Sequence, residues 1–335
     1  LDMHSVAQAV FTLVRVGKTS ADHRIAALVL QRALETLYDA KSGHFCYQKT
    51  AHYTNRLNYI RWTQAWVYYA FAFYLRQQTT HDVSKGGLMQ QIRFLNTNMH
   101  TGTMQQTLAW IDERIAAKQF TQHVVVNVAK LVHMQTDAAL ADSVTGCDIV
   151  NIDGMGVVWG ARFCGHPVEE RVAGVDLFMQ LIALSEAKGY PVFLLGATDE
   201  VVRQTVAVLS TQHPHLQIAG YHHGYFWDDE ESVVKAIRRS QARLLFVAIT
   251  SPKKENFIHQ WREQLGVDFV MGVGGTFDVV AGKVKRAPRW MQQAGLEWFY
   301  RIVQEPGRMW KRYLTTNSKF AWLLLKERFA NKKHR

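Results

Sequence analysis

Several motifs that mark common enzyme classes are missing from this sequence of 335 residues. It has no D-x-D, the acidic motif with which many sugar-nucleotide enzymes hold Mg²⁺ or Mn²⁺, and no G-x-G-x-x-G after an expected strand, the fingerprint of dinucleotide binding. It also lacks the H-E-x-x-H metal motif and the G-x-S-x-G nucleophile elbow. These absences disfavour metalloenzymes, serine hydrolases and Rossmann-type oxidoreductases.

Cysteines and long apolar runs are also scarce. The cysteines Cys46, Cys147 and Cys164 are odd in number and lack the short spacing of metal ligands, which argues against a disulfide framework and for a reducing compartment. No run reaches the ~20 apolar residues of a membrane-spanning helix, and no signal peptide is recognised in the sequence as given. We therefore expect a cytoplasmic protein.

The net charge is concentrated in a basic tail. Residues 283–335 hold 14 Lys and Arg against three Glu, which equals the whole formal charge of +11, while the remainder is balanced. Aromatic side chains, among them Trp290, Trp298, Trp310 and Trp322, are interleaved with these cations. That composition suits an anionic membrane surface, but it also suits nucleic acid or a solvated helical face packed on the rest of the protein.

The pattern of apolar residues changes along the chain. Residues 22–76 show helical spacing and predict an all-α region, and the polar residues 76–87 read as a linker. Beyond them, short apolar runs alternate with amphipathic segments, which predicts a mainly parallel, doubly wound α/β sheet covered on both faces. The expected strands are Ile92–Asn96, His123–Asn127, Asp148–Ile152, Pro191–Leu195, Leu216–Ala219, Leu244–Ile249 and Phe269–Val273. The expected helices between them are Thr103–Lys118, Thr136–Asp142, Asp176–Lys188, Asp199–Thr211, Asp229–Arg239 and Lys254–Leu265.

Small or polar residues follow several of these strands, and ligands of doubly wound folds bind at such strand ends. The stretch Asn151–Gly156, with the sequence NIDGMG, places the carboxylate of Asp153 there, although a structural turn would account for it as well. In Gly272–Thr276, glycines between a strand and a helix would let backbone N–H groups approach a diphosphate, or simply form a tight turn. The stretch Gly196–Asp199 could likewise hold a nucleotide, but a helix N-cap at Thr198 or Asp199 explains it without a ligand.

Residues from about 91 to 325 resemble the WecG/TagA/CpsF family of bacterial glycosyltransferases (glycosyltransferase family 26). The segments that carry the resemblance are Asn151–Val158, Arg171–Leu177, Pro191–Gly196, Gly224–Phe226, Ser251–Glu255, Gly272–Asp278, Lys285–Pro288, Gly295–Trp298, Arg301 and Pro306.

The resemblance implies an inverting, metal-independent transfer from a UDP-sugar to a polyprenyl-diphosphate-linked saccharide at the inner face of the cytoplasmic membrane. It implies that Asp153 is the general base, that no cofactor is needed, and that the basic tail closes over the site and docks on the anionic membrane. The residues expected to bind substrate are Asn127, Arg171, Gly196, Lys254, Gly274, Gly275, Thr276, Asp278, Arg286, Arg289, Arg301, Arg308 and Arg312. A nucleic-acid-binding module that uses the tail is the alternative.

Two positions depart from the family pattern. Val125 stands where the family usually has Thr, and Lys254 replaces the Gln of its P-K-Q-E motif, so the donor sugar is left open. The sequence therefore predicts three parts: a helical region in residues 1–88, a glycosyltransferase domain in 89–282, and a basic helical appendage in 283–335. In the first part, Phe45–Tyr47 and Arg61–Trp66 resemble the closing end of an α/α toroid, although too few helices are present to close a ring. We expect this part to dock a second copy or an assembly partner.

Overall fold

The computed structural model describes residues 2–15, 20–40, 42–50, 52–55, 68–72, 90–293, 295–304 and 306–333. Within its helices, the side chains of residues 14, 20–24, 289, 293, 301, 306, 308, 309, 311, 312 and 330–333 fall outside that description. The chain divides into two compact units, residues 1–87 and 88–335.

The first unit is built on two helices, α1 (Met3–Arg15) and α2 (Ser20–Leu37). Met3, Val6 and Val10 recur on one face of α1 and are buried, so this face packs against α2. Two short antiparallel pairs follow where only helix was predicted: β1 (Tyr38–Asp39) with β2 (His44–Phe45), and β3 (Gln48–Lys49) with β4 (Thr54–Asn55). The segment 61–66 of the toroid comparison and the linker 76–87 lie outside the described residues.

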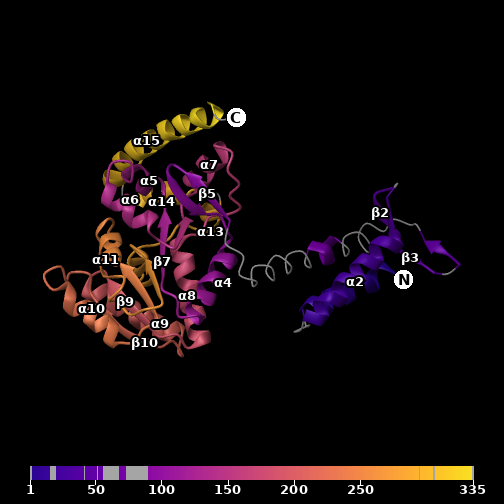
Figure 1. The fold of residues 1–335 in the computed structure, drawn as a ribbon, viewed down its shortest axis with the longest axis horizontal. Coiled ribbons are helices and arrows are strands. Elements are labelled where there is room, and N and C mark those ends of the chain that lie inside the picture. The colour runs from indigo at the N-terminus through magenta and orange to yellow at the C-terminus, as the bar shows by residue number, and fades with distance from the viewer. Residues whose placement is uncertain are drawn as a thin grey trace. The chain divides into compact units, whose positions relative to one another are not determined.

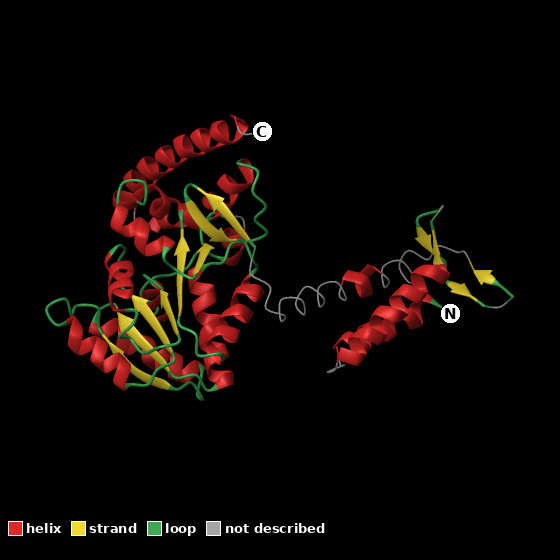
Figure 2. Ribbon diagram, viewed as in Figure 1, coloured by secondary structure: helices red, strands yellow, loops and turns green. Residues whose placement is uncertain are grey.

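The second unit contains an eight-stranded sheet in the order β10-β9-β11-β12-β7-β8-β6-β5, in which β5 alone runs antiparallel to its neighbour. The predicted mainly parallel, doubly wound sheet is confirmed (Figures 1 and 2). The strands are β5 (Gln91–Phe94), β6 (Thr97–His100), β7 (Thr121–Val126), β8 (Ile149–Ile152), β9 (Val192–Gly196), β10 (Ile218–His222), β11 (Leu244–Ala248) and β12 (Phe269–Gly272).

Successive side chains of the strands point to opposite faces of this sheet. Apolar side chains therefore lie on both faces, and helices cover both. On β11, Phe246 packs in the core beneath α4, α8, α9 and α12, whereas Val247 packs in the core beneath α10 and α11. The helices are α4 (Met104–Ala116), α5 (Val128–His133), α6 (Ala138–Thr145), α7 (Met155–Phe163), α8 (Gly174–Lys188), α9 (Asp199–Gln212), α10 (Glu230–Arg239), α11 (Lys253–Trp261) and α12 (Thr276–Val280).

The chain order reverses between β7 and β12: β7 is followed by β8 on one side, while β9 to β12 lie on the other. A crevice at the carboxyl ends of the strands is expected at such a reversal. The three helices of the appendage, α13 (Arg289–Gln293), α14 (Glu297–Gln304) and α15 (Pro306–Lys333), follow α12. Figure 1 shows α5, α14 and α15 beyond the end toward which β7 points.

The appendage is packed onto the helices that follow β7 and β8. Phe320 of α15 is buried, meets Phe94 edge to face, and together with Leu324 lies directly over Gly160 of α7. A side chain at position 160 would collide with both, since its Cβ would lie 2.9 Å from each. None of the described helices is long and apolar enough to cross a membrane.

Candidate active site

Asp153 lies at the carboxyl end of β8, as the sequence predicts. Its backbone N–H donates to the carbonyl of Val126 on β7 (2.9 Å), so the strand pairing continues one residue past β8 and fixes the position of Asp153. The side chain is partly exposed, and α7 begins two residues later. The ends of two strands therefore hold the carboxylate at the carboxyl edge of the sheet, where a crevice is expected.

The surroundings of this carboxylate come from β7 and from the start of α8. A Cβ built on Gly174 would lie 3.7 Å from Asp153 Oδ2 and 3.5 Å from Val125 Cγ2. A side chain larger than glycine at position 174 would thus occupy the space beside the carboxylate. Val125, the first departure from the family pattern, presents a methyl group to that same space.

Asn127 is the second strand-end residue that the structure brings to Asp153. It caps α5, because its Oδ1 accepts the backbone N–H of Lys130 (3.0 Å). Its Cβ lies 3.5 Å from the point that a Cβ on Gly154 would occupy, so the ends of β7 and β8 touch.

The glycine-rich turn lies on the other side of the reversal, between β12 and α12. Gly274 has φ +52°, a left-handed conformation that glycine adopts without strain. Thr276 directs both its N–H and its hydroxyl to the carbonyl of Val273, at 3.2 and 2.7 Å, so its polar groups hold the turn together. Within the described part of the chain, the N–H groups of Gly274 and Gly275 donate to no other group. Asp278 lies beside Gly275, with Oδ2 3.9 Å from the position of an added Cβ there.

Gly196 joins the ends of three strands. It has φ +129°, and a Cβ there would lie 2.4 Å from the carbonyl oxygen of Ala248, so only glycine fits between β9 and β11. Gly224, which follows β10, packs on the Cα of Gly196. Thr198 caps α9 as predicted, by accepting the N–H of Val201 (3.3 Å). The structure therefore places Gly196 at the carboxyl edge of the sheet, where its backbone packs between neighbouring strands.

Lys254 belongs to a buried ionic cluster that the sequence did not predict, which we call the inner cluster: Lys130, Lys254 and Glu255. Glu255 Oε1 lies 2.8 Å from Lys130 Nζ and 2.6 Å from Lys254 Nζ, and all three residues are less than one-tenth exposed. Lys130 Nζ also donates to the carbonyl of Val125 (2.9 Å), one strand position from Val126. Two ammonium groups thus share one carboxylate. Through Lys130 the cluster is hydrogen-bonded to Val125, whose side chain lies beside Gly174 as the carboxylate of Asp153 does.

The charged groups of the inner cluster shift one another's pKa values. Burial alone would raise the pKa of Glu255, but the ammonium groups of Lys130 and Lys254 outweigh burial and hold it at about 2. Burial, followed by the charge of Lys130, lowers the pKa of Lys254 to about 8 against the opposing pull of Glu255. The stem of Lys254 packs on Gly272, the last residue of β12. The inner cluster therefore joins both sides of the reversal: Lys254 contacts Gly272 of β12, and Lys130 donates to Val125 of β7.

A second ionic cluster joins the appendage to the body, and we call it the seam cluster: Arg171, Asp176, Arg286 and Glu297. Arg286 binds both carboxylate oxygens of Asp176, at 2.5 and 3.0 Å, and lies 3.5 Å from Glu297. Glu297, in the first turn of α14, also accepts a hydrogen bond from Arg171 (2.5 Å). The hydrogen bond to Asp176 is the main cause of the raised pKa of Arg286. Arg171 and Arg286, two of the arginines predicted to bind substrate, are thus paired with carboxylates.

The remaining arginines of the appendage are placed only by their backbone. Arg289 begins α13, Arg301 lies in α14, and Arg308 and Arg312 lie in α15. Their side chains are outside the described residues, so their predicted contacts with substrate stay predictions.

Three carboxylates of the acidic run Asp228–Glu231 make contacts that stabilise the fold. Asp229 caps α10, Glu230 accepts a hydrogen bond from the indole of Trp261, and Glu231 pairs with Lys235. Carboxylates in the first turn of a helix are also favoured by the helix dipole. Among the described residues, no group of three or more His, Cys, Asp or Glu side chains is arranged to hold a metal ion.

Comparison with known proteins agrees with this arrangement. The family model described as "Glycosyl transferase WecG/TagA/CpsF family" matches residues 92–334. An N-acetylglucosaminyldiphosphoundecaprenol N-acetyl-beta-D-mannosaminyltransferase of Bacillus subtilis is 35% identical over 245 residues, which cover 73% of this chain and 93% of that protein. A transferase of the same name from Bacillus spizizenii is 31% identical over 246 residues, with the same coverage. The chain, with Asp153 at the carboxyl end of β8, therefore belongs to the WecG/TagA/CpsF family of glycosyltransferases.

Proposed function

We propose that this glycosyltransferase moves a hexose, an N-acetylhexosamine or its uronic acid from a UDP-sugar to a polyprenyl-diphosphate-linked saccharide, in the assembly of a cell-surface or exported polysaccharide. The acceptor class follows from the names of the two Bacillus relatives, whose own acceptor is a saccharide on diphosphoundecaprenol. The observation that carries the proposal is the carboxylate of Asp153, fixed at the end of β8 with glycine opposite it.

The proposed reaction is a single displacement with inversion. Asp153 takes the proton of the acceptor hydroxyl, the hydroxyl oxygen forms a bond to the anomeric carbon, and the bond from that carbon to the UDP oxygen breaks. UDP leaves with the electron pair of that bond. The N–H groups of Gly274 and Gly275 and the cations of the appendage would stabilise its charge without a metal ion.

We further propose that the protein works at the inner face of the cytoplasmic membrane, as a peripheral protein. Its lipid-linked acceptor requires contact with a bilayer, and the appendage exposes large aromatic side chains beside its cations. Those described as exposed include Trp290, Trp298, Phe299 and Trp310. Flotation with phosphatidylglycerol vesicles but not with phosphatidylcholine vesicles would support this location, whereas binding to nucleic acid alone would contradict it.

The donor and the mechanism can be tested together on the full chain. We expect UDP-N-acetylmannosamine, its uronic acid, UDP-N-acetylglucosamine or UDP-glucose to raise the melting temperature, because a ligand of the folded state stabilises it by mass action. The sugar that does so should be transferred to N-acetylglucosaminyl-diphosphoundecaprenol with an inverted anomeric configuration, read by NMR, and in the presence of EDTA. Retained configuration, loss of activity in EDTA, or transfer to water alone would contradict the proposal.

A further inference from the structure

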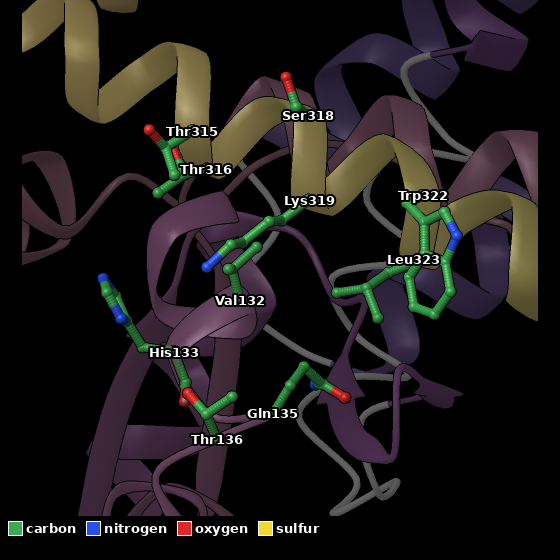
Figure 3. A pocket seen from close by; sticks show the side chains of 10 residues that line it. All are labelled: Val132, His133, Gln135, Thr136, Thr315, Thr316, Ser318, Lys319, Trp322 and Leu323. Carbon is green, nitrogen blue, oxygen red and sulfur yellow. Dashed lines mark hydrogen bonds between the residues drawn. The ribbon is translucent and has the colours of Figure 1, made fainter.

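A groove with a volume of about 500 Å³ lies between α5 and α15, and Asp153 is not among the residues that line it. Its walls include Val132 and His133 from the end of α5, and Lys319, Trp322 and Leu323 from α15 (Figure 3). The volume is in the range of ~300–1,000 Å³ that is usual for small-ligand sites. The groove is therefore large enough to hold part of a substrate.

The two ends of the groove differ in chemistry. In Figure 3 the ammonium group of Lys319 points toward Val132 and His133, on the side where Thr315 and Thr316 also lie. Trp322 and Leu323 form the other end, about one helical turn beyond Lys319 and two turns beyond Thr315 on α15. The indole of Trp322 is 61% exposed although it is large and apolar. A ligand that matches both ends carries negative charge at one end and hydrocarbon at the other.

The cation of the groove is available to such a ligand. Among the residues that the structure describes, Lys319 has no carboxylate within ion-pair distance, in contrast to Lys130 and Lys254 of the inner cluster. His133 is exposed at the end of α5, and its ring likewise has no hydrogen-bond partner among them. A diphosphate at this end of the groove would therefore meet positive charge that is not already neutralised.

Helix α5 runs from the neighbourhood of Asp153 to the wall of the groove. This helix begins at Asn127, which touches the turn after Asp153, and it ends in the groove wall. Val132 is five residues beyond Asn127, which corresponds to about 8 Å of helix. In a lipid-linked saccharide, one sugar ring and a diphosphate separate the reacting hydroxyl from the first isoprene unit, a span of similar size.

We propose that this groove binds the diphosphate and the first isoprene units of the acceptor lipid, with Lys319 at the diphosphate and Trp322 and Leu323 on the hydrocarbon. The inference deepens the proposed function and rests on it for the identity of the acceptor. Helix α5 starts beside Asp153, and α15 is held against it because α15 packs on α5 and, through Phe320, on α7. The groove can thereby set the register of the acceptor relative to Asp153.

Photolabelling tests the groove without any turnover. The probe is a farnesyl diphosphate that carries a benzophenone at the end of its prenyl chain, added to the full chain in the absence of lipid vesicles. We expect label in the peptide that contains Trp322 and Leu323. Trp322→Ala and Lys319→Glu should lower the labelling about tenfold, whereas Lys319→Arg keeps it. Phe329→Ala is the matched control, because Phe329 is equally exposed on α15 and does not line the groove.

Competition and kinetics complete the test. Farnesyl diphosphate should displace the probe, whereas phosphatidylglycerol vesicles should not. Three results would overturn the proposal: displacement of the probe by the vesicles alone, equal losses of labelling in Trp322→Ala and Phe329→Ala, or label outside the groove. In transfer assays, Trp322→Ala should raise KM about tenfold for the undecaprenyl acceptor and leave KM for the donor unchanged. If the wild-type chain transfers sugar to no lipid-linked acceptor, the proposed function fails, and labelling still decides whether the groove binds a prenyl diphosphate.

Discussion

The two ionic clusters beside the active site have similar members and different surroundings. The inner cluster joins two ammonium groups and one carboxylate, and its side chains are at most 8% exposed. The seam cluster joins two guanidinium groups and two carboxylates whose side chains are 16–41% exposed. Removing one member of a buried cluster leaves uncompensated charge in a medium of low dielectric, whereas water can replace a lost partner at the seam. We therefore expect the inner cluster to govern stability and the seam cluster to govern the attachment of the appendage.

The largest loss of stability should follow Glu255→Gln. The change leaves Lys130 and Lys254 side by side without a counterion, and loss of one partner of a buried pair lowers the free energy of unfolding by about 3–5 kcal/mol. Urea denaturation measures it. The matched control is Glu231→Gln, which breaks an exposed pair with Lys235 and should cost no more than about 1 kcal/mol. Equal losses in the two variants would contradict the distinction between buried and exposed clusters.

The pH dependence of stability should report the same carboxylate. Because the pKa of Glu255 falls from its ordinary value of 4.5 to about 2 in the folded protein, its stabilising contribution is present above pH 4.5 and is lost as the pH falls toward 2. The shift corresponds to about 3 kcal/mol. Denaturation between pH 5 and pH 2 should show this loss in the wild type and a smaller loss in Glu255→Gln; parallel curves would show that Glu255 is not its source.

At the seam, Glu297→Gln should affect activity more than stability. It weakens the hydrogen bond to Arg171 and the contact with Arg286, so we expect a loss of about 1–2 kcal/mol in the free energy of unfolding. It should also lower kcat/KM, because α14 is then held less firmly against the start of α8. Glu200→Gln, which breaks only the surface pair with Lys283, is the control and should leave kcat/KM unchanged. An unchanged kcat/KM in Glu297→Gln would refute the role of the seam.

The smallest effect is expected at Val125, which lies between the inner cluster and Asp153. Val125→Thr restores the hydroxyl that the family pattern leads one to expect, at a position that is only half buried. We expect the KM for the donor to change by less than about tenfold, the value of one hydrogen bond, with little change in melting temperature. The matched change Val124→Thr places a hydroxyl in the core and should lower the melting temperature without improving the KM. A loss of stability in Val125→Thr as large as that in Val124→Thr would contradict this placement.

Much of the sheet could be predicted because its buried parallel strands carry a strong local signal. Buried parallel strands such as Leu244–Ala248 are continuous apolar runs. The strand β5 is predicted within Ile92–Asn96, but β6 is not. The turn between them uses Leu95 and Asn96, both with positive φ, where Asn-Gly or Asp-Gly is the usual sequence. The helices α5 and α7 are short and apolar, so they show no clear helical periodicity.

The position of Asp153 could be predicted, whereas its ionic surroundings could not. A strand-end carboxylate is visible in a single segment, together with the glycines that follow it. Lys130 and Glu255 are 125 residues apart in the chain, and each alone reads as an ordinary charged residue of a helix. Likewise, Arg286 and Asp176 are brought together only by the fold. The docking role of residues 1–88 stays a prediction.

The most direct test of the account is Asp153→Asn, measured for turnover and for ligand binding in the same preparation. The amide keeps the shape of the side chain and cannot take a proton, so kcat should fall about 10²–10⁴-fold. UDP should still raise the melting temperature of the variant as much as that of the wild type, because the proposed diphosphate contacts lie at Gly274, Gly275 and the appendage. Full turnover with normal binding of UDP would show that Asp153 is not the base and would contradict the account.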